Sequence, residues 1–211
     1  MMDSQPHPHC KDLGLEARPA PYRGIVSEIF RYVCWGFLKL FGWKLEGAWP
    51  HETKKMIVIA APHTSNWDGF FMVACGAYYR IKFSWMGKRS LTVPPHGWIT
   101  KAAGCIPVDR GGSNDVVSQM VETFNQRERL VLAVAPEGTR RPTKDWKSGF
   151  YHIAYSAGVP LLITVLDYSR KRVRLAGLLQ PTGDYETDLA AILTKYEGAE
   201  GKIKGSFLLP D

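Results

Sequence analysis

From residue 56 onward the chain alternates short apolar runs with amphipathic stretches. Buried strands are predicted over the apolar runs 56–61, 81–87, 105–109, 130–135 and 159–168, with 172–179 as a further strand. Helices are predicted over 69–80, from Ser113 through Phe124, over 149–158 and over 186–198. Strands that alternate with helices indicate an α/β fold with a mainly parallel sheet flanked by helices.

The segment before this domain has a different character. Residues 1–24 are rich in proline, histidine and charge, which predicts a flexible arm. Residues 25–43 are densely apolar but carry Glu28, Arg31 and Lys39, which a spanning helix would have to bury in lipid. On a helix these charges share an arc of about 80°, so an amphipathic helix in the membrane interface is predicted. A helix packed on the domain core is the alternative. Residues 44–211 are predicted to form a single α/β domain.

Charge and cysteine content limit the partners and the compartment. The chain has 27 basic and 20 acidic residues, a net charge of +7, which favours anionic partners such as a phospholipid surface, nucleic acid or an acidic carrier protein. Its cysteines, Cys10, Cys34, Cys75 and Cys105, show no metal-binding spacing, so we expect reduced thiols and no metal site. Without a secretory signal at the amino terminus, a cytoplasmic location is predicted.

Two polar stretches, PHTSNWD and PEGTRRP, directly follow predicted strands. Ligands of open α/β sheets bind at that edge. In the first stretch, His63 and Asp68 are too far apart on a regular helix to meet, but Pro62, Ser65 and Asn66 favour a turn that would join them. An aspartate that orients a histidine leaves its other ring nitrogen as a general base. The alternative is that Asp68 only caps the following helix.

Positive charge gathers after other strands. The cationic candidates are Lys88, Arg89, Arg110, Arg140 and Arg141. Guanidinium groups beside Gly111, Gly112 and Gly138 suit a bound phosphate, and solvated surface arginines are the alternative. No G-x-S-x-G or S-x-x-K motif is present, which disfavours a hydrolase with a covalent serine.

Four stretches in this order resemble the conserved blocks of the glycerolipid acyltransferases, a family that includes the 1-acyl-glycerol-3-phosphate (lysophospholipid) acyltransferases. They are HTSNWD (63–68), GCIPVDR (104–110), PEGTR (136–140) and GVPLL (158–162), and they span about half of the chain. KRSL from Lys88 also resembles small bacterial members. One departure is that Ile163 and Thr164 stand where the family often has a second proline.

The resemblance implies roles for individual residues. His63 would be the general base and Asp68 its orienting partner. The glycerol phosphate of the acceptor would be bound by a polar set: Lys88, Arg110, Glu137, Gly138, Thr139 and Arg140. Val159 and Pro160 would shape the acyl-donor site. Acyl-CoA or acyl-acyl carrier protein would be the co-substrate, with no permanently bound cofactor and no metal.

The predicted function is therefore transfer of a fatty acyl chain from a thioester to a lysophospholipid hydroxyl, in phospholipid biosynthesis. The first choice of acceptor is 1-acyl-glycerol-3-phosphate; glycerol-3-phosphate and a non-phosphate lipid are alternatives. A catalytically silent lipid-binding protein of the same fold is a further alternative. The predicted location is peripheral, on the inner face of an anionic membrane, with no nucleic-acid partner.

Overall fold

A seven-stranded sheet organises the chain in the computed structural model, which describes residues 24–95, 97–109 and 113–210. Its strands are β1 (Lys44–Glu46), β2 (Lys55–Ala61), β3 (Phe83–Lys88), β4 (Cys105–Val108), β5 (Leu130–Val134), β6 (Leu161–Asp167) and β7 (Arg172–Leu179). They lie in the order β1-β7-β6-β2-β5-β3-β4. The five strands from β6 to β4 are parallel, while β7 pairs antiparallel with β6. The predicted α/β class with a mainly parallel sheet is confirmed.

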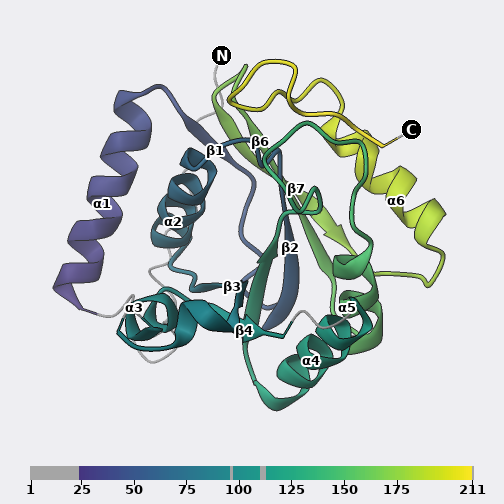
Figure 1. The fold of residues 1–211 in the computed structure, drawn as a ribbon. Helices are drawn as coiled ribbons and strands as arrows, with labels where there is room; N and C mark the ends of the chain where they lie inside the picture. Colours follow the sequence, from purple (N-terminus) through teal and green to yellow (C-terminus); the bar gives the residue numbers. More distant parts are fainter. Residues whose placement is uncertain (1–23, 96, 110–112, 211) are drawn as a thin grey trace.

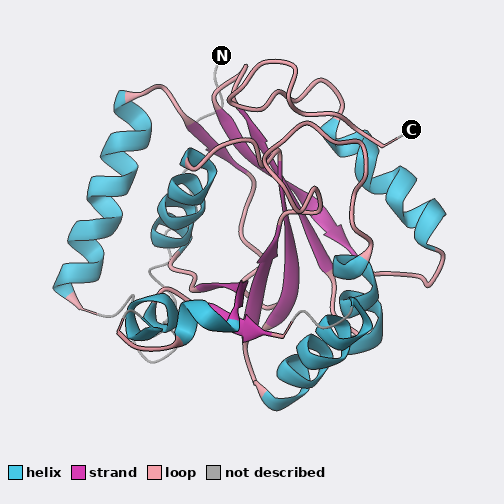
Figure 2. Cartoon of the chain, in the orientation of Figure 1, coloured by secondary structure: helices cyan, strands magenta, loops and turns pink. Residues whose placement is uncertain are grey.

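Helices cover both faces of this sheet (Figures 1 and 2). They are α1 (Ile25–Leu40), α2 (Trp67–Tyr79), α3 (Gly97–Ala102), α4 (Ser113–Gln126), α5 (Gly149–Ala157) and α6 (Tyr185–Leu193), with 3-10 turns η3 (Arg89–Thr92) and η4 (Thr194–Tyr196). In Figure 1, α1 and α2 lie on one side of the sheet and α4, α5 and α6 on the other. The sheet is therefore the middle layer between two groups of helices.

The alternation of side chains along each strand divides the core in two. Along β2, Ile57 and Ile59 face a cluster shared with α4 and α5, whereas Met56 and Val58 face a cluster shared with α1 and α2. Successive residues of a strand point to opposite faces, so a strand between two helical layers must be apolar on both. This explains why β2 is a continuous apolar run.

Helix α1 packs on α2 but presents much of its apolar surface outward. Cys34 and Leu38 are buried in the second cluster, whereas Val26 is 80% and Leu40 is 81% exposed. The predicted segment 25–43 is helical only as far as Leu40. Within the described part of the chain, no helix is both long enough and apolar enough to cross a membrane. All but the last residue of the predicted arm, 1–24, lies outside the described residues.

Two charged residues of α1, Glu28 and Arg31, face the domain. The Glu28 carboxylate accepts two hydrogen bonds from the Arg80 guanidinium, at 2.8 and 2.7 Å, and pairs with Arg31 at 3.1 Å. The hydrogen bond from Arg80 is the largest influence on Glu28 and lowers its pKa to about 2. The side chains of Arg31 and Arg80 are only 16% and 11% exposed. This part of the charged arc therefore anchors α1 to α2.

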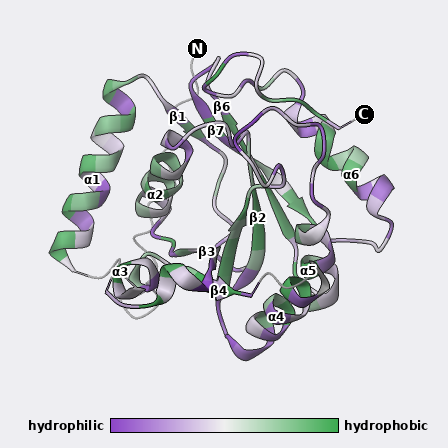
Figure 3. Ribbon diagram, viewed as in Figure 1, coloured by the Kyte–Doolittle hydropathy of each residue, from purple (hydrophilic) through white to green (hydrophobic). Residues whose placement is uncertain are grey.

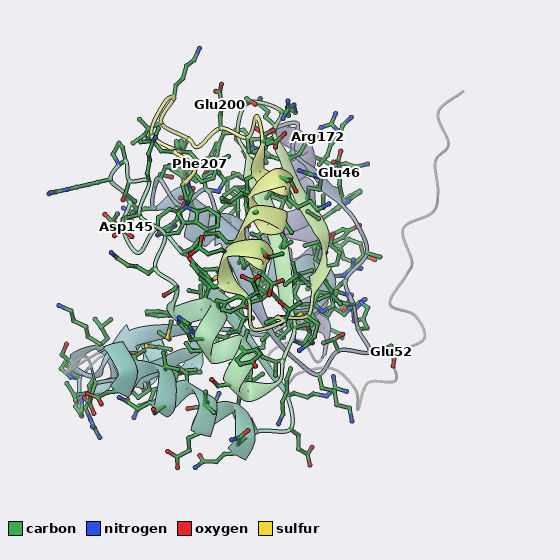
Figure 4. The ribbon with its side chains drawn as sticks, turned by 90° about the vertical axis from the view of Figure 1, so that its right-hand side faces the viewer. Glu46, Glu52, Asp145, Arg172, Glu200 and Phe207 are labelled. Atoms are coloured by element: carbon green, nitrogen blue, oxygen red, sulfur yellow. The ribbon has the colours of Figure 1, made fainter. Side chains whose placement is uncertain are left out.

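Two regions differ from the expected pattern. Strand β1 has only three residues and joins the sheet beside β7, where Arg172 pairs with Glu46 at 2.6 Å (Figure 4). The segment 89–102, for which no element was predicted, forms η3 and α3. Both elements are short, and short segments carry too few residues to establish a period.

Candidate active site

The chain turns sharply as it leaves β2, and Asp68 holds that turn closed. Asp68 lies in the first turn of α2, with Asn66 at the N-cap, so the helix begins two residues earlier than predicted. Its Oδ2 atom accepts hydrogen bonds from the backbone N–H groups of Thr64 and Ser65, both at 2.7 Å. The side chain of Asp68 therefore binds the backbone of the loop before it, whereas a helix-capping residue would bind the backbone that follows it.

His63 and Asp68 meet across this turn. Nδ1 of His63 lies 3.3 Å from Oδ2 of Asp68, and the two side chains are 33% and 5% exposed. Burial raises the pKa of Asp68, but hydrogen bonds, led by those from His63 and Tyr168, outweigh burial and bring it below its ordinary value. Asp68 is thus a carboxylate at neutral pH. With Nδ1 directed to this carboxylate, Nε2 of His63 is left for proton transfer.

Glu137, at the carboxyl end of β5, fixes the backbone of the same histidine. Its Oε1 atom accepts the backbone N–H of His63 at 2.9 Å. The side chain is buried, and no described residue hydrogen-bonds its Oε2 atom. Burial is the largest influence and raises the pKa of Glu137. Glu137 is thus buried and supports the backbone of His63, and it does not line either cavity. The acceptor-binding role that the resemblance implies for it stays a prediction.

A cationic cavity of about 380 Å³ opens on one side of His63. The residues that line it with His63 are Gly138, Thr139, Arg140 and Arg141. The Arg140 guanidinium donates to Oδ1 of Asn66, which draws the loop after β5 to the loop after β2. Gly138 has a positive φ of 61°, so the tight turn of this loop favours glycine. Two arginines beside a histidine provide a site for an anionic group.

An apolar cavity of about 410 Å³ also reaches His63 and extends between the sheet and α2. Beyond the carboxyl ends of β2 and β5 it is lined by His63, Asp68 and Gly138, and along the sheet by Ala60 and Ala133. Aromatic side chains line it as well, among them Trp49 in the loop after β1, Tyr79 in α2 and Phe83 in β3. His63 and Gly138 border both cavities. The site therefore joins an apolar channel to a cationic pocket at one imidazole.

Other predicted residues lie elsewhere. Lys88 ends β3 at the same sheet edge as His63. It is not one of the residues that line the two cavities described above. Val159 is buried in the core, and the Pro160 carbonyl accepts the backbone N–H of Ile57 at 3.0 Å, just before β6 begins. That is the amino end of β6, at the opposite edge from His63. Arg110 lies outside the described residues.

Sequence reasoning missed Tyr168, which follows β6 directly. Its hydroxyl donates to Oδ1 of Asp68 at 2.6 Å, across 100 residues of sequence. The available signal was its position, a polar side chain after a strand that ends at the same sheet edge as β2. It also missed the aromatic wall of the apolar cavity, because those side chains come from separate segments.

Comparison with known proteins places this chain in a family. A model of the acyltransferase family matches residues 44–166. The 1-acyl-sn-glycerol-3-phosphate acyltransferases of Haemophilus influenzae and Escherichia coli are 30% and 28% identical over 145 residues, which is 64% of this chain. The matches cover 59% and 58% of those two proteins, so the chain spans about three-fifths of the relatives' length.

A solved acyltransferase structure has a similar fold. The crystal structure of the 1-acyl-sn-glycerophosphate acyltransferase of Thermotoga maritima superposes with a TM-score of 0.52 at 15% identity. The superposition covers 80% of this chain and 76% of that one. At this identity the likeness concerns the fold alone. Since the family model matches more than half of the sequence, the chain belongs to the acyltransferase family.

Proposed function

We propose that the protein is an O-acyltransferase that moves a fatty acyl chain from an acyl thioester to the hydroxyl of 1-acyl-glycerol-3-phosphate. One observation carries the proposal: the His63 imidazole, oriented by Asp68, borders both an apolar cavity and a cationic cavity. A lysophospholipid acceptor and an acyl donor together need an apolar volume, an anion site and a base between them. The names of the relatives support the same acceptor.

In the proposed mechanism, Nε2 of His63 removes the proton of the acceptor hydroxyl as its oxygen attacks the thioester carbonyl. A C–O bond forms, and the carbonyl electrons move to oxygen in a tetrahedral intermediate. The C–S bond then breaks, and the thiolate takes its proton from His63. Asp68, ionised at neutral pH, stabilises the imidazolium between the two steps. Acyl-CoA or acyl-acyl carrier protein supplies the thioester.

The cationic cavity would hold the phosphate of the acceptor. Arg140 and Arg141 lie beside His63 there, and guanidinium groups bind phosphate through paired, charge-assisted hydrogen bonds. The apolar cavity would receive an acyl chain, because its lining is mostly aliphatic and aromatic. Arg110 and Lys88 remain proposed phosphate ligands on the resemblance alone.

Helix α1 would keep the enzyme on the inner face of an anionic membrane. Figure 3 colours most of α1 as hydrophobic, although it covers the outside of α2. Two of its three charged residues, Glu28 and Arg31, pair toward Arg80. Lys39 is exposed, and the apolar Val33 is 61% exposed. A surface helix normally shows its polar face to water, so this reversal favours a helix that lies in the lipid interface.

A donor-by-acceptor panel read by mass spectrometry tests the proposed function. Acyl-CoA and acyl-acyl carrier protein are each combined with 1-acyl-glycerol-3-phosphate, glycerol-3-phosphate and a lysolipid without phosphate, with heat-denatured protein as the control. The expected result is phosphatidate from 1-acyl-glycerol-3-phosphate with at least one donor. If product formed only from another acceptor, that lipid would replace 1-acyl-glycerol-3-phosphate as the proposed acceptor. No product from any combination, together with measurable lysolipid binding, would favour the silent lipid-binding protein.

A further inference from the structure

Tyr168 contacts the proposed catalytic pair from a different part of the fold. It follows β6, while His63 and Asp68 lie between β2 and α2. Its hydroxyl donates to Oδ1 of Asp68 at 2.6 Å. Among the described residues, the other groups that contact this carboxylate belong to His63, Thr64 and Ser65, which lie in the turn itself.

The ring of Tyr168 is held in place on several sides. Trp43 and Phe71 meet it edge to face, with ring centroids 5.0 and 5.6 Å away. Its backbone N–H donates to the carbonyl of Glu200 at 2.9 Å. A tyrosine fixed by packing and by a backbone bond presents its hydroxyl in one position, which suits a group that orients another residue.

We propose that Tyr168 is a positioning residue of the transfer reaction, acting through Asp68 on the orientation of His63. The kinetic part of this inference rests on the proposed function. The two oxygens of Asp68 have different partners. Oδ2 accepts hydrogen bonds from the turn backbone and faces His63, whereas Oδ1 accepts the Tyr168 hydroxyl and, at 3.2 Å, the Ser65 hydroxyl. Without the Tyr168 hydroxyl, Oδ1 keeps only the longer bond to a rotatable hydroxyl. Oδ2 stays on the N–H groups of Thr64 and Ser65, but the plane of the carboxylate is then fixed at one oxygen only, which loosens the alignment of Oδ2 with Nδ1 of His63.

A double-mutant cycle separates positioning from simple support of the fold. Tyr168→Phe keeps the ring and removes the hydroxyl, and we expect kcat/KM at pH 7.5 to fall about tenfold, as for a lost bond to a charged group. In an Asp68→Asn background the same change should have less than about a twofold further effect, because its route is already broken. An equal fold-loss in both backgrounds would overturn the proposal.

Tyr151→Phe is the matched control. The Tyr151 hydroxyl donates to Asp188 at 2.7 Å, so this variant also loses a tyrosine–aspartate bond, but in α5 and outside both cavities. We expect Tyr151→Phe to lower the melting temperature and leave kcat/KM unchanged. A kcat/KM loss in Tyr151→Phe equal to that in Tyr168→Phe would reduce Tyr168 to a stabilising residue and defeat the inference.

A spectroscopic reading does not depend on catalysis. In protein labelled with 15N-histidine, the ring shifts report which nitrogen carries the proton in the neutral form, and a His63→Gln spectrum identifies the His63 signals. His63 should carry its proton on Nδ1 in the wild type, with a mixture of both tautomers in Tyr168→Phe and no change in Tyr151→Phe. An unchanged tautomer in Tyr168→Phe would contradict the inference even if the wild type transferred no acyl chain in the panel.

Discussion

At the residue scale, the chemistry depends on how Asp68 and Glu137 differ. Both are buried carboxyl groups near His63, yet hydrogen bonds lower the pKa of Asp68 while burial raises that of Glu137. Asp68 faces donors, whereas one oxygen of Glu137 has no partner among the described residues. The first carboxyl suits a charged partner for an imidazolium, and the second suits a fixed acceptor for a backbone N–H.

Glu137→Gln tests this difference through protein stability. A carboxyl whose folded-state pKa is raised contributes stability that is fully present below its unfolded value of 4.5 and is lost as pH rises through the folded value. The amide can still accept the His63 N–H but cannot ionise. We therefore expect the urea-unfolding free energy of Glu137→Gln, relative to the wild type, to improve from pH 4 to pH 8. A difference that stays constant across this range would contradict the assignment.

Arg140→Ala tests the cationic cavity. If Arg140 binds the acceptor phosphate, the KM for 1-acyl-glycerol-3-phosphate should rise about 10- to 100-fold, the range for a lost charge-assisted bond. Arg129→Ala is the matched control, because Arg129 precedes β5 at the opposite end of the strand from Arg140. Equal KM values for the two variants would place the phosphate elsewhere.

The turn residues between His63 and Asp68 predict that the two side chains can meet, because turn chemistry is local, and the resemblance to the acyltransferase blocks predicts that they act as a catalytic pair. The partners of the pair could not be predicted in the same way. Tyr168 and Glu137 reach the turn from β6 and β5, and only the register of the parallel sheet brings those strand ends beside it. Contacts of this kind depend on tertiary packing, which local sequence does not encode.

At the element scale, α1 packs on the domain and also keeps an exposed apolar face, on which the proposed membrane contact depends. It packs on the domain through Cys34 and Leu38, and it exposes an apolar face that includes Val33. Deleting α1 would uncover core residues and confuse lipid binding with unfolding. A point charge on the exposed face is therefore the better test of the interface helix.

Val33→Glu should weaken binding to vesicles of anionic phospholipid about tenfold or more, because it removes an apolar side chain from the interface and adds a like charge. Leu178→Glu is the matched control: it makes the same change in charge at a 46% exposed position on β7. Both variants should keep the wild-type circular dichroism. Equal flotation of the two variants would exclude α1 as the lipid contact.

The apolar cavity yields a prediction about acyl-chain length. Ala133 of β5 pairs in register with Val58 of β2. Ala60 lies two residues beyond Val58, nearer the carboxyl end of β2, so Ala133 lies farther from that end than Ala60 does. Ala133→Leu should fill the deeper part and lower kcat/KM about tenfold more for a 16-carbon than for an 8-carbon donor. Ala60→Leu, nearer the carboxyl end of β2, should affect both donors alike. A loss independent of chain length in Ala133→Leu would mean that the chain lies elsewhere.

Element prediction succeeded for the strands from β2 to β7 and failed for β1 and for the short helices between 89 and 102. The strands β2, β5 and β6 were predicted to within about two residues, because each is a continuous apolar run between two helical layers. The three-residue β1 was not predicted, since its pairing with β7 depends on a distant strand. The pattern could not indicate that β7 runs antiparallel to β6 either.

At the scale of the whole molecule, parallel strands bring their carboxyl ends to one edge, and both cavities open there. His63 follows β2, Glu137 follows β5 and Tyr168 follows β6. The prediction that ligands bind at this edge needed only the alternation of strands and helices. Which side chains line which cavity could not be read from the sequence, because β2, β3, β5, β6, β7, α2 and the loop holding Trp49 all contribute to the lining of the apolar cavity.

Turnover by His63→Ala is the most direct measurement of the central claim. Thiol release from acyl-CoA with 1-acyl-glycerol-3-phosphate is followed for both proteins, with melting temperature and circular dichroism as checks on folding. We predict that kcat/KM falls about a thousandfold or more, as expected for removal of a general base, while the fold is kept. Near-normal turnover by a folded His63→Ala protein would contradict the account.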